Sequence, residues 1–159
     1  MKKIILIVFV VIISLLLLFN GKEGDTKEFE KIINSIVISA NEKDLEKFMS
    51  YFSIHYSDEH GGNYLYIKSI AKNTFEDFEK FDVYYENISV ARIKSENSQD
   101  IAVLNFDVVV SGIKNGIPIA EIIGSSGHLE NLTIEFKKSD LRKWKIINVE
   151  GINDKNFYQ

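Results

Sequence analysis

Hydrophobic residues recur at helical spacing in three stretches between residues 25 and 78. The first follows i, i+3, i+4, i+7 spacing, which predicts an amphipathic helix, with Asp25 and Glu28 as its capping start. Asp44 is the predicted N-cap of a second, shorter helix, and a third helix is expected after Gly61-Gly62. The buried faces should carry Phe29, Ile32, Ile33, Ile36, Val37 and Ala40, then Leu45, Phe48, Met49 and Phe52, then Tyr64, Ile67, Ile70, Ala71, Phe75 and Phe78.

From residue 81 the hydrophobic period changes to two, which predicts β-strands. The stretch "FDVYYENISVARIK" slips by one residue between Tyr85 and Ile88, as a β-bulge would require. Asn115-Gly116 predicts a type I′ hairpin turn. Further strands are expected in "IPIAEII", "LTIEFKK" and "KWKIINVEGI", with turns or loops at "SENSQ", "GSSGHLEN" and "SDLR". In "DIAVLNFDVVVSGI" the row that should face the helices is Ala102, Leu104, Phe106, Val108 and Val110.

Three helices followed by a bent antiparallel meander predict an α+β fold with the helices packed on one face of a curved sheet. The chain from about Asp25 to Ile152 resembles the nuclear transport factor 2-like superfamily, whose cone-shaped fold is also called cystatin-like or SnoaL-like. The resemblance rests on "FEKIINSIVISANEKDLEKFMSYFS", the third helix, the hairpin about Asn115-Gly116 and the terminal strand "WKIINVEG". The superfamily includes isomerases, dehydratases, ligand binders and association modules, so the fold does not fix the function.

The opening "MKKIILIVFVVIISLLLLFNGKEG" has two lysines before an apolar run from Ile4 to Phe19. This run spans about 24 Å as a helix, against about 30 Å for a hydrocarbon core. Residues 1–21 are therefore expected to be a signal peptide or membrane anchor, and residues 22–159 a nuclear transport factor 2-like domain. No small-x-small cleavage site is found, which favours an uncleaved anchor with the domain outside the cytoplasm of a bacterial cell. A secreted or periplasmic protein is the alternative.

Composition narrows the choice of partners. The chain has no cysteine, so neither a disulfide nor a lipoprotein anchor is expected. Its formal charge is −4, and leaving out Lys2 and Lys3 takes the remainder to −6. No Lys/Arg stripe interleaved with aromatic residues occurs, so we expect no nucleic-acid partner. No motif calls for a cofactor, and none is expected.

The segment "HYSDEHGG" raises the question of a metal site, because His55 and His60 flank Asp58 and Glu59. Zinc needs three or four converging ligands, and the third histidine of the chain, His128, is far away in sequence. The alternative is a polar loop whose acids bond to backbone amides. We favour the loop and retain His55 and His60 as the alternative metal candidates.

Asp107 is the candidate acid for acid–base chemistry in a cone pocket, because it lies in the middle of a predicted strand. By resemblance, enzymes of this superfamily place a carboxylate, and often a tyrosine, inside the cone. Strand alternation turns Asp107 and Asn105 away from the helices, towards the outer face of the sheet. Together with Tyr64 and Tyr85, which are expected near where helix ends meet the sheet, they form the candidate pocket or interface set.

Two hypotheses of function follow. The first is a non-catalytic envelope protein, anchored by its N-terminal helix, that binds a small apolar ligand or associates with proteins, for example as a homodimer through the outer sheet face. The second is an isomerase- or dehydratase-type enzyme that uses a carboxylate in the cone. The direction of the Asp107 side chain discriminates them, because catalysis requires it to point inward.

Overall fold

The computed structural model describes residues 26–94, 100–125, 127–139 and 143–152. An N-terminal helix is described over residues 26–41 and is followed by α2 (Leu45–Met49) and α3 (Tyr64–Asp77). Five strands complete the chain: β1 (Lys80–Lys94), β2 (Asp100–Lys114), β3 (Ile117–Ile123), β4 (Glu130–Lys138) and β5 (Trp144–Glu150). The predicted α+β order, with three helices preceding an antiparallel sheet, is confirmed.

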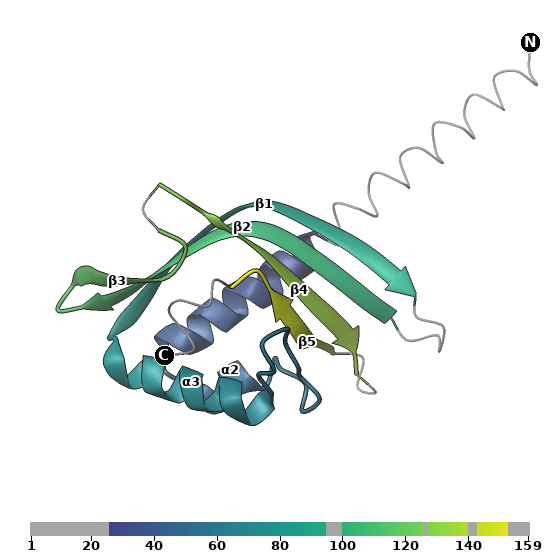
Figure 1. The fold of residues 1–159 in the computed structure, drawn as a ribbon, viewed down its shortest axis with the longest axis horizontal. Coiled ribbons are helices and arrows are strands. Elements are labelled where there is room, and N and C mark those ends of the chain that lie inside the picture. Colours follow the sequence, from purple (N-terminus) through teal and green to yellow (C-terminus); the bar gives the residue numbers. More distant parts are fainter. Residues whose placement is uncertain (1–25, 95–99, 126, 140–142, 153–159) are drawn as a thin grey trace, which may run out of the picture.

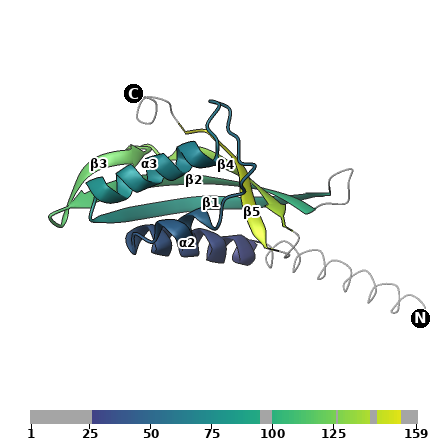
Figure 2. The ribbon, with the colours of Figure 1, turned by 90° about the horizontal axis from the view of Figure 1, so that it is seen from below.

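The sheet is antiparallel throughout, with β1, β2, β4 and β5 in spatial order. Strand β3 pairs with the end of β2 that β4 leaves free, so β3 and β4 continue one another along the same edge of β2. In Figure 1 the long strands β1 and β2 arch over the helices. The N-terminal helix and α3 both lie beneath this arch in Figure 1, and Figure 2 gives the view from below.

Local signals account for the helix starts and for two irregularities of the sheet. The Asp44 side chain accepts a hydrogen bond from Lys47 N, as an N-cap does, and Asn63 caps α3 in the same way. The predicted slip in the first strand is a register shift between Glu86 and Ser89. The predicted hairpin turn has positive φ at both central residues, 53° at Asn115 and 72° at Gly116.

Two expected helix ends are wrong. Phe78 lies just outside α3 with extended backbone angles. Phe52 lies outside α2, because the chain from residue 50 onwards leaves the helix and runs beside β5. There Ser53 N donates to Ile146 O (2.8 Å) and Ile146 N donates to Tyr51 O (2.8 Å). These backbone bonds with β5 replace further helical turns.

The core lies between the helices and the predicted inner row of β2, of which Ala102, Leu104, Phe106 and Val108 are buried. Phe29 of the N-terminal helix is fully buried, with its ring centroid 5.0 Å from that of Phe136. The alternation of β2 therefore places its apolar row under the helices.

Several sequence-based expectations concern residues outside the described ranges. These are the N-terminal segment 1–21, the Asp25 cap, the "SENSQ" turn and most of the "SDLR" turn. Among the described residues no helix has the length and hydropathy needed to cross a membrane.

Candidate functional site

A cavity of about 280 Å³ lies between the helices and the inner face of the sheet. Every strand contributes apolar side chains to its wall. The strand residues that line it are Phe81, Val83, Phe106, Val108, Val110, Ile122, Ile123, Leu132, Ile134, Ile146 and Val149.

The helices close the opposite side of this cavity with further apolar side chains. The N-terminal helix, α2 and α3 together supply Ile33, Ile36, Val37, Ala40, Phe48, Ile67, Ile70, Ala71 and Phe75. The core predicted from the hydrophobic pattern is thus only partly filled by its own side chains. The space left in it has the character of a binding site for apolar molecules.

Among the described residues, the polar side chains that line the cavity are Tyr56, Asp58 and Thr74. Thr74 belongs to α3, whereas Tyr56 and Asp58 belong to the loop between α2 and α3. Tyr56 is 3% exposed, and its hydroxyl donates to Asp58 Oδ2 at 3.2 Å. Within the described ranges, the carboxylate at the cavity therefore comes from "HYSDEHGG" and not from the sheet.

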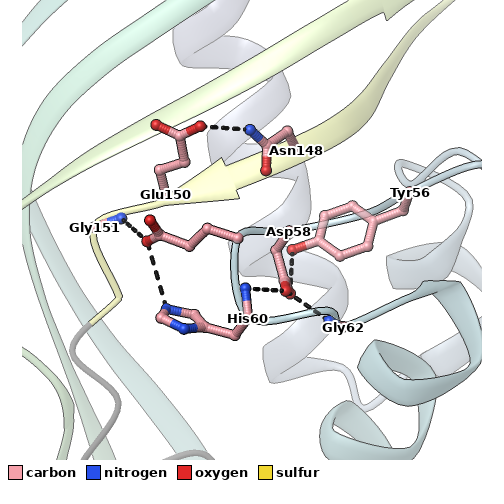
Figure 3. Close-up of polar contacts among 8 residues, drawn as sticks. Tyr56, Asp58, His60, Gly62, Asn148, Glu150 and Gly151 are labelled. Carbon is pink, nitrogen blue, oxygen red and sulfur yellow. Dashed lines mark hydrogen bonds and ion pairs between the residues drawn. The ribbon is translucent and has the colours of Figure 1, made fainter.

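The Asp58 carboxylate also organises its own loop (Figure 3). Its Oδ1 accepts from Gly62 N at 2.7 Å and from His60 N at 3.1 Å. In the backbone, Asp58 N donates to Gly62 O at 3.1 Å. This pattern is the Asp-centred turn that the polar-loop interpretation of the segment anticipated, with an acid bonded to backbone amides.

The loop is held against β5 at several points. Ser57 N donates to Ile147 O at 3.1 Å, and Phe52 forms a parallel bridge with Ile146. Further along, Glu59 Oε1 lies 3.5 Å from Gly151 N, just after the end of β5. These contacts join the loop to a strand about 90 residues later and fix where Asp58 lies.

Both histidines of the segment make contacts close by in the sequence. His60 Nε2 lies 3.4 Å from Glu59 Oε1, while the exposed His55 donates its backbone N–H to Ser53 Oγ at 3.1 Å. In the described part of the chain no three His, Cys, Asp or Glu side chains converge as metal ligands.

The two candidate tyrosines lie beside the core and outside the cavity wall. Tyr64 begins α3 and packs against the core cluster. The Tyr85 hydroxyl donates to Asn34 Oδ1 at 3.0 Å, and its ring meets Phe106 edge-on. Neither residue contributes to the surface of the cavity.

Asn105 and Asp107 lie on the outer face of the sheet, opposite the buried row of β2. Asp107 accepts from Asn87 Nδ2 at 2.7 Å and from Asn131 Nδ2 at 2.9 Å, and Asn105 Oδ1 accepts from Thr133 Oγ1 at 2.7 Å. The Asn131 and Asn87 amides together hold the pKa of Asp107 below its usual value of 3.8. The Asp107 carboxylate faces away from the cavity and therefore cannot act as an acid inside it.

Sequence reasoning did not assign Asp58 and Tyr56 to the cavity. The available signal was an acid followed by two glycines, which marks a tight Asp-centred turn. That signal gives the loop its shape. It does not say which part of the sheet the loop approaches.

No protein-family profile matches the sequence, and no curated protein is significantly similar to it. Three solved structures illustrate what its fold resembles. Bd1075 of Bdellovibrio bacteriovorus has a TM-score of 0.57 and 16% identity, over 78% of this chain and 40% of that one. The helical cell shape determining protein Pgp2 of Campylobacter jejuni has a TM-score of 0.56 and 10% sequence identity, over 74% of this chain and 38% of that one. An NTF2-like protein with a cystatin-like fold from Novosphingobium aromaticivorans has a TM-score of 0.58 and 13% sequence identity, over 82% of this chain and 84% of that one.

These similarities show that the chain has the nuclear transport factor 2-like, cystatin-like fold. This chain spans about two fifths of the first two proteins and most of the third. At 10–16% identity the likeness concerns the fold alone.

Proposed function

We propose that this protein is a binding domain for a small apolar molecule, which it holds between the helices and the inner face of the sheet. The observation that carries the proposal is the cavity of about 280 Å³, whose wall, as far as the chain is described, is apolar except for Tyr56, Asp58 and Thr74. Transfer of apolar surface from water into such a wall is the dominant favourable term in binding.

The size of the cavity suits a compact ligand. An engineered apolar cavity of about 150 Å³ stays free of water and binds benzene, whereas sites for drug-sized molecules start at about 300 Å³. At about 280 Å³, this cavity has nearly twice the volume of the benzene site. Two fused rings, or a branched aliphatic chain of similar bulk, match that volume.

The proposal is tested on the full chain in lipid nanodiscs, with empty nanodiscs as the blank. Organic extraction and mass spectrometry should identify a co-purified apolar molecule, and calorimetry should detect binding of naphthalene. Ala71, 7% exposed, lines the cavity. Ala71→Phe should fill the space and abolish both signals, whereas Ala91→Phe on the exposed face of β1 should preserve them. A wild-type protein that binds neither would refute the proposal, provided that circular dichroism shows it folded.

An acid–base enzyme of the isomerase or dehydratase type is the second candidate. The observation in its favour is the Tyr56–Asp58 pair at the cavity, and the candidate acid is now Asp58 instead of Asp107. We rank it second because two backbone amides and the Tyr56 hydroxyl already engage that carboxylate. Conversion of the co-purified molecule by the wild type and not by Asp58→Asn would reverse the ranking.

For location, we propose that residues 1–21 anchor the protein in the membrane and that the domain lies outside the cytoplasm. The support is the apolar run after Lys2 and Lys3. The same fold also occurs within a larger protein described as determining helical cell shape. Protease added to spheroplasts should degrade a C-terminal tag without lysis, and a protected tag would contradict this orientation.

The outer sheet face is the surface we propose for self-association. Val103 and Val109 flank the polar pair Asn105 and Asp107 on that face and are only partly buried in the single chain. Light scattering coupled to size exclusion should report a dimer that Val109→Lys dissociates. A monomeric wild type would exclude this interface.

A further inference from the structure

We infer that the ligand of the cavity carries one hydrogen-bond donor, a hydroxyl or an amine, and that this donor bonds to the Asp58 carboxylate. This inference rests on the proposed function, because it assigns a chemical class to a molecule bound in the same cavity. It makes Asp58 a specificity-determining residue, with the rest of the wall supplying apolar contact.

The Asp58 carboxylate has an unused hydrogen-bond acceptor position. An ionised carboxylate has about four lone-pair sites and no donor. Among the described residues, Oδ1 of Asp58 accepts from His60 N and Gly62 N, and Oδ2 accepts only from the Tyr56 hydroxyl. One acceptor position on Oδ2 is therefore left, on a residue that lines the cavity.

The Asp58 carboxylate is already oriented before any ligand binds. Its loop is bonded to β5 through Ser57 N and Ile147 O, and Oδ1 is fixed by Gly62 N at 2.7 Å. A group held in this way loses little further freedom when a ligand arrives, so its hydrogen bond contributes more to affinity. Hydrogen bonds to a charged acceptor are also about twice as strong as those between neutral groups.

Asp58 favours ligands that carry a hydrogen-bond donor over ligands that carry only an acceptor. A carboxylate accepts hydrogen bonds and repels other acceptors, so a ligand with only an ether or ketone oxygen gains nothing from Asp58. When such an oxygen enters an otherwise apolar cavity, it loses its hydrogen bonds to water and gains none from Asp58. Thr74 is the remaining polar side chain of the wall, and its hydroxyl could both donate and accept. A test must therefore separate Asp58 from Thr74.

The experiment compares three ligands of nearly equal shape on the full chain in nanodiscs: naphthalene, 2-naphthol and 2-methoxynaphthalene. Calorimetry against empty nanodiscs gives each dissociation constant. We expect the wild type to bind 2-naphthol at least as tightly as naphthalene, and 2-methoxynaphthalene about tenfold more weakly than 2-naphthol. Asp58→Asn should remove the preference for 2-naphthol over 2-methoxynaphthalene. Thr74→Val and the outer-face variant Asp107→Asn should retain the preference.

The outcomes separate this inference from the proposed function. If none of the three ligands binds, the proposed function itself fails. If naphthalene binds while 2-naphthol binds about tenfold more weakly, the cavity is a purely apolar site and only the inference on Asp58 is overturned. Equal affinities for 2-naphthol and 2-methoxynaphthalene in the wild type would overturn it in the same way. This comparison needs no variant, so it remains decisive even if Asp58→Asn does not fold.

Discussion

The aromatic ring of Phe78 lies directly against the backbone of Gly112. A methyl group added at Gly112 would lie 2.3 Å from Phe78 Cδ1 and 2.7 Å from its Cγ. Gly112 is a buried residue of β2, whereas Phe78 follows the last residue of α3. The absence of a side chain on the strand thus allows the end of the helix to pack against it.

Gly112→Ala is therefore expected to destabilise the fold. The ring atoms in the way include Cγ, so a small movement of the ring tip cannot relieve the overlap. Overpacking of this kind costs about 1–3 kcal/mol. Urea unfolding of the variant should show a loss of that size. The same substitution made in a Phe78→Ala background should cost less than half as much, and an equal cost in both backgrounds would mean that Phe78 is not the obstacle.

The two glycines of the Asp58 loop, Gly61 and Gly62, lack a side chain for different reasons. A Cβ at Gly62 would lie 2.3 Å from Asp58 Oδ2, whereas at Gly61 nothing lies within 4 Å. Gly61 instead has a φ of +81°, which favours glycine for conformational reasons. Gly62→Ala should push the carboxylate away from its backbone donors, and Gly61→Ala should only strain the turn.

This contrast gives a matched pair of variants for the cavity. We expect Gly62→Ala to lose the preference for 2-naphthol over 2-methoxynaphthalene and Gly61→Ala to keep it. The strain at Gly61 should lower the free energy of unfolding by about 1–2 kcal/mol. Calorimetry and urea unfolding measure the two effects separately. Loss of ligand preference in both variants would show that general loosening of the loop is the cause.

The arrangement of secondary structure follows from local sequence signals. Asp44 caps α2 as predicted, and the slip between Tyr85 and Ile88 becomes a bulge in which Asn87 has a φ of 56°. Both features depend on residues close in sequence. Short-range periodicity and capping chemistry are sufficient to predict them.

The cavity could not be predicted in the same way. Asp58 reaches it because residues 51–57 run along β5, and this pairing joins residues about 90 positions apart. Within its own segment Asp58 has the sequence context of an ordinary polar turn. Periodicity also identifies which apolar residues face the core without saying whether they fill it. The open space depends on how far the helices lie from the curved sheet, a property of tertiary packing.

Acid should lower the free energy of unfolding, because it protonates Asp107 on the outer face of the sheet. The side-chain amides of Asn131 and Asn87 lower the pKa of Asp107 from its usual 3.8 in the folded protein. A lowered folded-state pKa means that the carboxylate stabilises the fold above about pH 4, and that this contribution is lost as the pH falls through the folded-state pKa. Urea unfolding midpoints of the wild type should therefore fall below pH 4 more steeply than those of Asp107→Asn. Parallel curves for the two proteins would contradict the assignment.

The Asn41 side chain forms hydrogen bonds with the backbone at the start of β1, where a neighbouring strand would otherwise pair. Its Oδ1 accepts from Phe81 N at 2.7 Å, and its Nδ2 donates to Phe81 O at 3.2 Å. Strand β1 pairs with β2 on one side only, so these two backbone groups would otherwise lie on an open edge next to the buried ring of Phe81. The amide thus ties the end of the N-terminal helix to the first strand.

Asn41→Ala should remove both hydrogen bonds and leave a partly buried N–H and C=O unsatisfied, at about 1–3 kcal/mol for each group. Asn41→Asp is the matched control, because it keeps an acceptor for Phe81 N and loses only the donor to Phe81 O. We expect urea unfolding to rank the stabilities as wild type, then Asn41→Asp, then Asn41→Ala. Amide exchange at Phe81 should be faster in Asn41→Ala than in Asn41→Asp. Equal exchange in the two variants would mean that the backbone of β1 is protected by the sheet alone and that Asn41 has no structural role at this edge.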